Sequence, residues 1–118
     1  MKRILLVDDS MVMRKILSDI LTANGYEICG EAADGVDAVR KYNELKPDLV
    51  TMDITMPNVD GIAALRKIRE NNPDANCIMC SSMGQEPLLI EAVQCGAKDF
   101  IIKPFKSDKL LRDVRNAI

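Results

Sequence analysis

Three acidic residues stand where apolar runs of the chain end. Asp53 follows the run from Leu49 to Met52, and Asp8 and Asp9 follow another apolar run near the amino terminus. A carboxylate at a strand end is well placed for chemistry, because the loops at that edge of an open α/β sheet diverge and leave a crevice. Lys103 ends a third apolar run and brings a positive charge. Together these residues outweigh the simplest alternative, in which Asp53 only caps a turn.

The residue types at these run ends favour phosphoryl transfer. Carboxylates held close together repel one another, and at least one takes up a proton unless a cation compensates. Mg²⁺ accepts oxygen ligands from carboxylates, waters and phosphates. Lys103 adds a mobile positive charge, and Ser81, at the end of a fourth apolar run, adds a hydroxyl. Catalysis of phosphoryl transfer is mostly positioning and charge neutralisation, and aspartate is an established nucleophile for it.

The elements that must position these residues alternate along the chain. Short apolar runs predict five strands, and stretches with helical spacing of apolar residues predict a helix after each strand. The predicted strands cover residues 2–7, 26–33, 49–52, 75–81 and 99–102. This alternation indicates an α/β fold, a doubly wound parallel sheet with helices on both faces. Right-handed crossovers and a topological switch beside the first strand favour strand order 2-1-3-4-5. In that order Asp8, Asp9 and Asp53 converge, flanked by Ser81 and Lys103.

Apolar residues at helical spacing indicate the buried side of each helix. In the second helix we expect them to be Val36, Val39, Tyr42 and Leu45. The fourth helix begins near Pro87 and is expected to bury Leu88, Leu89, Ala92 and Val93. Ser107 is the predicted N-cap of the last helix.

Length and composition limit the class of protein. A chain of 118 residues predicts one domain over residues 1–118. No apolar run approaches the roughly 20 residues that span a bilayer, and Met1 leads into a strand rather than a signal-peptide core. We therefore expect a soluble cytoplasmic protein. The net charge of −2, with both signs interleaved, argues against non-specific nucleic-acid binding.

The four cysteines predict no metal site. Cys77 and Cys80 have C-x-x-C spacing but fall in a predicted strand, where an odd separation points them to opposite faces. The chain has no histidine, so a zinc site would also need Cys29 and Cys95. Small buried apolar residues in a reducing compartment are the simpler interpretation.

Several short motifs, taken in order, resemble one family. These are Leu6-Val7-Asp8-Asp9-Ser10, Met52-Asp53-Ile54-Thr55-Met56-Pro57, Asp60-Gly61, Ser81 and Lys103-Pro104-Phe105. Each is weak alone, but their order and spacing resemble the receiver domain of two-component response regulators across the whole chain. The length is similar to the single-domain chemotaxis regulators of the CheY type. The resemblance implies a (βα)5 fold of the flavodoxin-like kind.

The same resemblance assigns the site. It implies that Asp53 is the phosphoacceptor and that Mg²⁺ is held by Asp8, Asp9, a carboxylate oxygen of Asp53 and the backbone carbonyl of Thr55. Ser81 would hydrogen-bond one phosphoryl oxygen and Lys103 would pair with another. A cis peptide bond is implied before Pro104.

Partners also follow from the resemblance. A sensor histidine kinase would be the phosphodonor, and a flagellar motor switch protein would be the target. A phosphatase would be a further partner. The chain itself would be a monomer. The alternative output is a phosphorelay intermediate or another regulated partner. The chain would be a phosphoacceptor that assists its own phosphorylation and dephosphorylation rather than an enzyme. Phe100 is either a switch residue that turns inward or plain core. The output face would carry basic residues, namely Lys98, Lys106, Lys109, Arg112 and Arg115.

Two positions depart from many family members. Thr55 stands where they have Asn, and Met83 stands where they have Glu, so neither offers the same polar contact to an attacking water.

Two rival functions use similar features. A haloacid-dehalogenase-type phosphatase also has a strand-end aspartate, but it needs a cap domain and leaves Asp8 and Asp9 on the wrong strand. A flavodoxin-like FMN carrier shares the sheet order, but these two carboxylates would repel the phosphate of the flavin.

Overall fold

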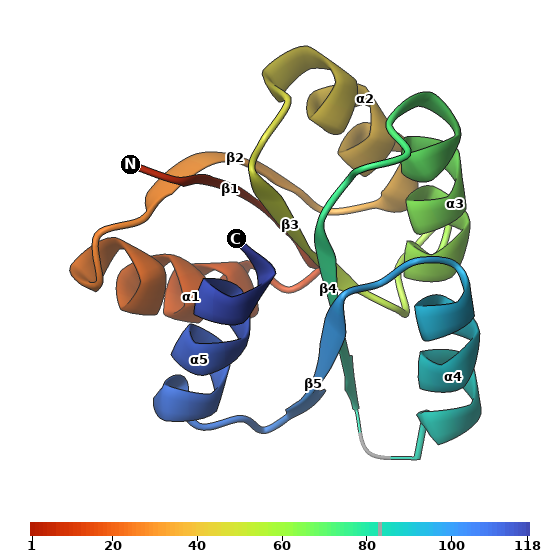
Figure 1. The fold of residues 1–118 in the computed structure, drawn as a ribbon. Coiled ribbons are helices and arrows are strands. Elements are labelled where there is room, and N and C mark those ends of the chain that lie inside the picture. The colour runs from red at the N-terminus through yellow and green to blue at the C-terminus, as the bar shows by residue number, and fades with distance from the viewer. Residues whose placement is uncertain (83) are drawn as a thin grey trace.

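The computed structural model describes residues 1–82 and 84–118. Within these ranges, strands and helices alternate along the chain (Figure 1). In chain order they are β1 (Arg3–Val7), α1 (Met11–Ala23), β2 (Glu27–Ala32), α2 (Gly35–Leu45), β3 (Leu49–Asp53), α3 (Gly61–Asn71), β4 (Cys77–Ser82), α4 (Glu86–Gln94), β5 (Asp99–Lys103) and α5 (Ser107–Ala117). The strands form one parallel sheet in the order β2-β1-β3-β4-β5, which confirms the predicted topology.

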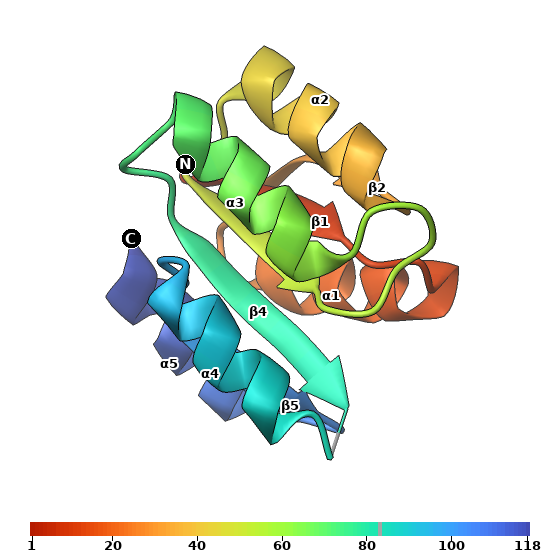
Figure 2. The same cartoon turned by 90° about the vertical axis from the view of Figure 1, so that its right-hand side faces the viewer.

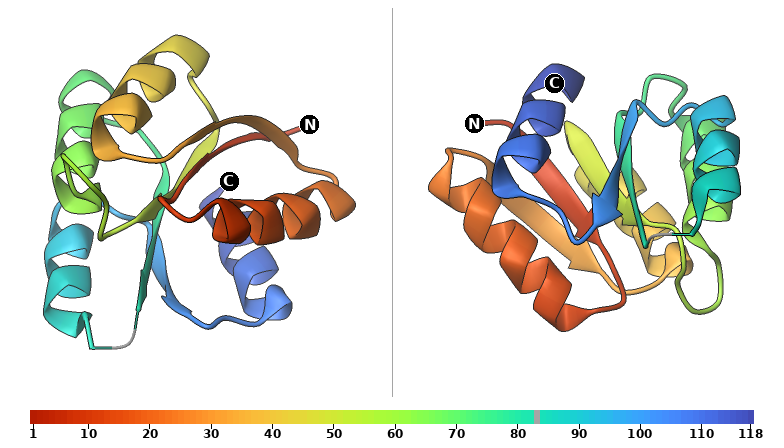
Figure 3. Two further views of the ribbon diagram at one scale, coloured as in Figure 1. Left: turned by 180° about the vertical axis from the view of Figure 1, so that it is seen from behind. Right: turned by 90° about the horizontal axis from the view of Figure 1, so that it is seen from below.

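Helices cover both faces of the sheet. Figures 2 and 3 show α2, α3 and α4 on one face and α1 with α5 on the other. Each face has its own core: Leu5 packs beneath the first group of helices, whereas Ile4 and Leu6 pack beneath the second. A strand buried on both faces needs apolar residues at every position, and this explains the uninterrupted run in β1. Among the described residues, no helix combines the length and the apolar character that crossing a bilayer requires.

Three helices, α1, α2 and α3, begin with a side-chain cap. Ser10, Asp34 and Asp60 each accept a hydrogen bond from the backbone N–H three residues later, at 3.2, 2.8 and 2.9 Å. Early caps keep the loops after β1 and β2 short, so the strand ends stay close to the helix starts. The predicted cap at Ser107 is wrong, because the N-cap is Lys106 and Ser107 is the first residue of α5.

Part of the predicted helix burial is also wrong. Val36, Leu88 and Val93 are 57%, 38% and 48% exposed, whereas Ala38 and Ala92 are fully buried. Periodicity indicates a helix face, but small residues allow the closest approach of a helix to a sheet. In α2 and α4 the buried side combines an alanine with one large residue, Tyr42 in α2 and Leu89 in α4.

The two cysteines of β4 lie as predicted, whereas Cys29 and Cys95 are less buried than predicted. Cys77 and Cys80 are both buried in β4 and belong to the cores on opposite faces of the sheet. Cys29 and Cys95 are partly buried, and all four thiols are free.

Candidate functional site

Strand register brings the predicted site residues to one edge of the sheet. Val7 pairs with Met52 of β3, so Asp8, the next residue along the chain, is level with Asp53. In the neighbouring strands on the far side of β3 from β1, Ser82 pairs with Lys103 at the ends of β4 and β5. All strands are parallel, so their carboxyl ends meet at this edge.

The three predicted carboxylates and the predicted lysine form one cluster. Asp8, Asp9 and Asp53 each offer a carboxylate oxygen within 4.8 Å of the others. Asp8 and Asp53 are buried, whereas Asp9 is exposed. The Lys103 Nζ lies 2.7 Å from Asp8 Oδ2 and 3.5 Å from Asp53 Oδ2. The single positive charge of Lys103 therefore bridges two carboxylates, Asp8 after β1 and Asp53 at the end of β3.

One lysine does not balance this cluster. Burial raises the pKa of Asp53 to about 6 against the attraction of Lys103, and repulsion from Asp8 and Asp9 adds to the rise. Burial opposes the charging of Lys103, but its hydrogen bond to Asp8 and the charge of Asp53 outweigh this, so the lysine pKa is raised. Three carboxylates and one lysine have a negative formal charge in total, which a bound cation would offset.

Neighbouring groups fix the position of Asp8. Its Oδ1 accepts a hydrogen bond of 2.9 Å from the backbone N–H of Ser10. Its backbone carbonyl accepts one of 2.6 Å from Arg14 Nη1, and Arg14 also pairs with Glu31 at 3.0 Å. Sequence reasoning missed Arg14, because its place on the first turns of α1 gives no sign that it reaches back to the strand end.

The loop after β3 returns closely to Asp53. Asn58 adopts a left-handed conformation with φ 67°, which asparagine tolerates better than most residues. The chain then turns so that Gly61 N–H donates to the Ile54 carbonyl at 2.7 Å. A Cβ on Gly61 would collide with the backbone carbonyl of Asp53, so only glycine fits this close approach.

Ser81 and Thr55 complete the predicted set. Ser81 is fully buried, and its Oγ has no hydrogen-bond partner among residues 1–82 and 84–118. Thr55 is exposed, and its Oγ1 accepts a hydrogen bond of 2.8 Å from Gln85 Nε2. The other departure from the family, Met83, lies outside the described residues.

The donors of the cluster fit a hard divalent cation. Asp8, Asp9 and Asp53 present only oxygen ligands, and Lys103 is the one cation that pairs with their carboxylates among the described residues. Mg²⁺ prefers such ligands and keeps several waters. The acidic cluster can therefore bind a metal ion.

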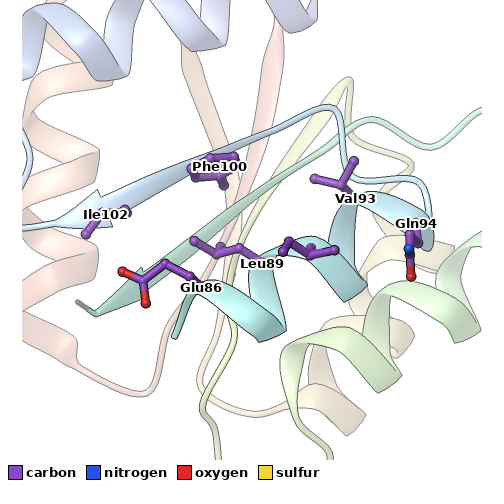
Figure 4. A pocket seen from close by; sticks show the side chains of 7 residues that line it. Glu86, Leu89, Val93, Gln94, Phe100 and Ile102 are labelled. Atoms are coloured by element: carbon purple, nitrogen blue, oxygen red, sulfur yellow. The ribbon is translucent and has the colours of Figure 1, made fainter. Parts of the chain in front are cut away.

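A second feature lies between α4 and β5. Leu89 and Val93 of α4 and Phe100 and Ile102 of β5 line an apolar groove of about 480 Å³. Figure 4 shows these side chains around the groove. Phe100 is 38% exposed.

Two further expectations concern the neighbouring segments. The Lys103-Pro104 peptide bond is cis, as expected. Lys109, one of the expected basic surface residues, forms an ion pair of 2.5 Å with the buried Asp113.

Comparisons with known proteins agree with this geometry. Residues 4–115 match the model of the response regulator receiver domain. The chain is 54% identical over 110 residues to a chemotaxis protein CheY of Thermotoga maritima, covering 93% of this chain and 92% of that protein. It is 53% identical over 116 residues to CheY of Bacillus subtilis, covering 98% and 97%.

Solved structures show the same fold. The CheX–CheY–BeF3–Mg²⁺ complex from Borrelia burgdorferi contains a chain with a TM-score of 0.93 and 43% identity, covering 98% of this chain and 87% of that one. The response regulator domain of Thermotoga maritima CheB has a TM-score of 0.91 and 44% sequence identity. The match covers 98% of this chain and 95% of that one. These matches favour a receiver over the phosphatase and flavin-binding alternatives.

Proposed function

The chain belongs to the response regulator receiver domain family, and on that premise we propose that Asp53 accepts a phosphoryl group from a sensor histidine kinase. The observation that supports this most strongly is the cluster of three carboxylates within 4.8 Å, bridged by Lys103. Residues 1–118 act as one receiver domain of a chemotaxis response regulator. The chain acts in the cytoplasm as a monomer.

The transfer uses Asp53 as the nucleophile. An oxygen of its ionised carboxylate attacks the phosphorus of a phosphohistidine, the P–N bond breaks, and an acyl phosphate forms on Asp53. Burial and the pKa of about 6 leave this carboxylate ionised at neutral pH but poorly solvated, so it is available to react. The chain is a phosphoacceptor, and its residues assist the transfer and later hydrolysis of the acyl phosphate.

Lys103 and Ser81 contact the transferred group in this proposal. The Lys103 ammonium already lies 3.5 Å from Asp53 Oδ2 and would pair with a phosphoryl oxygen. Ser81 has a buried hydroxyl without a partner in the described part of the chain, and a phosphoryl oxygen would accept its hydrogen bond. Both side chains thus stabilise charge that arrives with the phosphoryl group.

Mg²⁺ is the cofactor that this site fits. Asp8, Asp9, Asp53 and the Thr55 carbonyl would hold it. When bound, Mg²⁺ supplies positive charge that offsets the carboxylates and the phosphoryl oxygens. Without Mg²⁺, the negatively charged phosphoryl group would have to bind at a site where three carboxylates face a single lysine.

Labelling with acetyl phosphate tests the assignment. Intact-mass spectrometry should show one added phosphoryl group with Mg²⁺ and none with EDTA. Asp53→Asn should abolish labelling, whereas Asp19→Asn, which removes an exposed carboxylate of α1, should leave it unchanged. Full labelling of Asp53→Asn, or labelling at an unchanged rate in EDTA, would refute the proposal.

The output we propose is binding of a flagellar motor switch protein at α4, β5 and α5. The apolar groove beside Phe100 and the basic residues of this face support it. Calorimetric titration of the motor protein's N-terminal peptide should give tighter binding to beryllofluoride-treated protein than to untreated protein, and equal affinities would contradict this output. The peptide's failure to bind either form would favour a phosphorelay role. A phosphatase is expected as a further partner.

A further inference from the structure

Gln85 joins the end of β4 to the loop that follows β3. Its side-chain Oε1 accepts a hydrogen bond of 2.8 Å from the backbone N–H of Ser82, and its Nε2 donates one of 2.8 Å to Thr55 Oγ1. Ser82 follows Ser81 directly, and Thr55 lies two residues after Asp53. We refer to these two hydrogen bonds as the Gln85 bridge.

The position of Gln85 is unusual for such a role. Gln85 is the N-cap residue of α4, and its carbonyl accepts the first helical hydrogen bonds, from Leu88 and Leu89. An N-cap side chain normally accepts from the N–H groups of its own helix, but the Gln85 side chain makes no such bond. It is turned back across the site, and a long amide side chain loses considerable rotamer freedom when it is held in this way.

The Ser81 hydroxyl beside the bridge, unlike the Gln85 side chain, is not hydrogen-bonded. Ser81 Oγ is buried without a hydrogen-bond partner in the described ranges, and an unsatisfied buried hydroxyl is unfavourable. A displacement of the Ser81 backbone toward Asp53 would carry the adjoining Ser82 N–H along, because the Ser81 Cα and the Ser82 N–H belong to one planar peptide unit. The Gln85 bridge therefore holds the strand end in a position that leaves the Ser81 hydroxyl unsatisfied.

We propose that Gln85 is a positioning residue that stabilises the resting conformation, and that its bridge must open when Ser81 moves toward a phosphoryl group on Asp53. The inference rests on the function proposed above. The bridge sets the equilibrium between resting and active conformations, because its hydrogen bonds exist in only one of them. Opening it also releases the Thr55 side chain, which couples the β3 loop to the same change.

The test measures the affinity of the Mg²⁺-loaded protein for beryllofluoride, a stable mimic of the phosphoryl group. Gln85→Ala removes the bridge from the resting state and should tighten beryllofluoride binding about threefold to tenfold, equivalent to about 0.6–1.4 kcal/mol. Thr55→Val keeps the backbone carbonyl and the branched shape, removes one hydrogen bond, and should tighten binding by a smaller factor. The matched control is Asn71→Ala, which removes an exposed amide at the end of α3 and should change nothing.

A second measurement uses the unmodified chain, so it does not depend on how a variant folds. In ¹H–¹⁵N spectra, the Gln85 side-chain amide should shift when beryllofluoride is added to the Mg²⁺-loaded protein, and much less when Mg²⁺ alone is added. Opening of the bridge should also speed the exchange of the Gln85 side-chain amide protons with water, whereas a merely structural role would leave this exchange rate unchanged.

The outcomes separate the two proposals. If the unmodified protein fails to bind beryllofluoride with Mg²⁺, the proposed function is wrong. If it binds but Gln85→Ala binds equally or more weakly, or the Gln85 amide does not respond, the inference about Gln85 is wrong and the function stands.

Discussion

Asp53→Asn should stabilise the metal-free protein at neutral pH, although it destroys the proposed phosphorylation site. The pKa of Asp53 is raised from 3.8 to about 6 in the folded chain, mainly by burial and further by Asp8 and Asp9. The folded protein therefore binds a proton more tightly than the unfolded chain does. Its stability falls as the pH rises from about 3.8 to about 6, and the full loss is present above that window.

The magnitude follows from the same pKa values. At 1.36 kcal/mol per pH unit, the difference between 3.8 and about 6 corresponds to about 3 kcal/mol lost on ionisation. Asparagine removes this charge but must place its amide, so we expect a gain of about 1–3 kcal/mol at pH 7.5. Lys103 keeps its 2.7 Å contact with Asp8 in the variant, so the change leaves no lysine unpaired.

Urea denaturation in EDTA measures this free energy of unfolding. The gain from Asp53→Asn should be full at pH 7.5 and should shrink toward zero at pH 4, where the native carboxyl is already protonated. Asp19→Asn, an exposed carboxylate paired with Lys15, should change stability by less than about 0.5 kcal/mol. A variant no more stable than the parent at pH 7.5, or a gain that persists unchanged at pH 4, would refute the electrostatic reasoning.

Three other predictions follow from the same geometry and core. Lys103→Met leaves the buried Asp8 carboxylate without its 2.7 Å partner and should lower the free energy of unfolding in EDTA by about 2–4 kcal/mol, measured in urea at pH 7.5; an unchanged midpoint would contradict it. Mg²⁺ binding, followed by calorimetry, should weaken as the pH falls through about 6, because a proton then competes for Asp53; constant affinity from pH 7.5 to 5 would contradict this. Leu65→Ala, at a fully buried position, should cost about 2–5 kcal/mol in urea, whereas Val36→Ala should cost less than about 0.5; equal losses would show that the assigned burial is wrong.

The sheet and its acidic edge were predictable because the physical signals are strong. A strand covered on both faces requires a nearly continuous run of apolar or β-branched residues. β1 has such a run before Asp8, and β3 has one, with Thr51 as its β-branched member, that ends on Asp53. Parallel strands then place Asp8 and Asp53 at the same edge without any knowledge of side-chain contacts.

Finer features depend on packing that the sequence does not contain. Periodicity correctly placed Leu89 and Ala92 in the core, but it also placed Val36 and Val93 there, which are exposed, and it missed the buried Ala38. The Gln85 bridge had no signal at all, because a glutamine near the start of a helix can adopt many rotamers and only the neighbouring loop selects one.

The contact between Lys103 and Asp8 spans 95 residues of the chain. During synthesis, the carboxylates of β1 and β3 therefore leave the ribosome long before the lysine that offsets their repulsion. A nascent or truncated chain that lacks β5 would have an acidic cluster without this cation, and it should neither hold the strand ends together well nor accept a phosphoryl group efficiently. In the function proposed above, phosphorylation would thus require a folded chain with β5 in place, so unfinished chains would accept few phosphoryl groups.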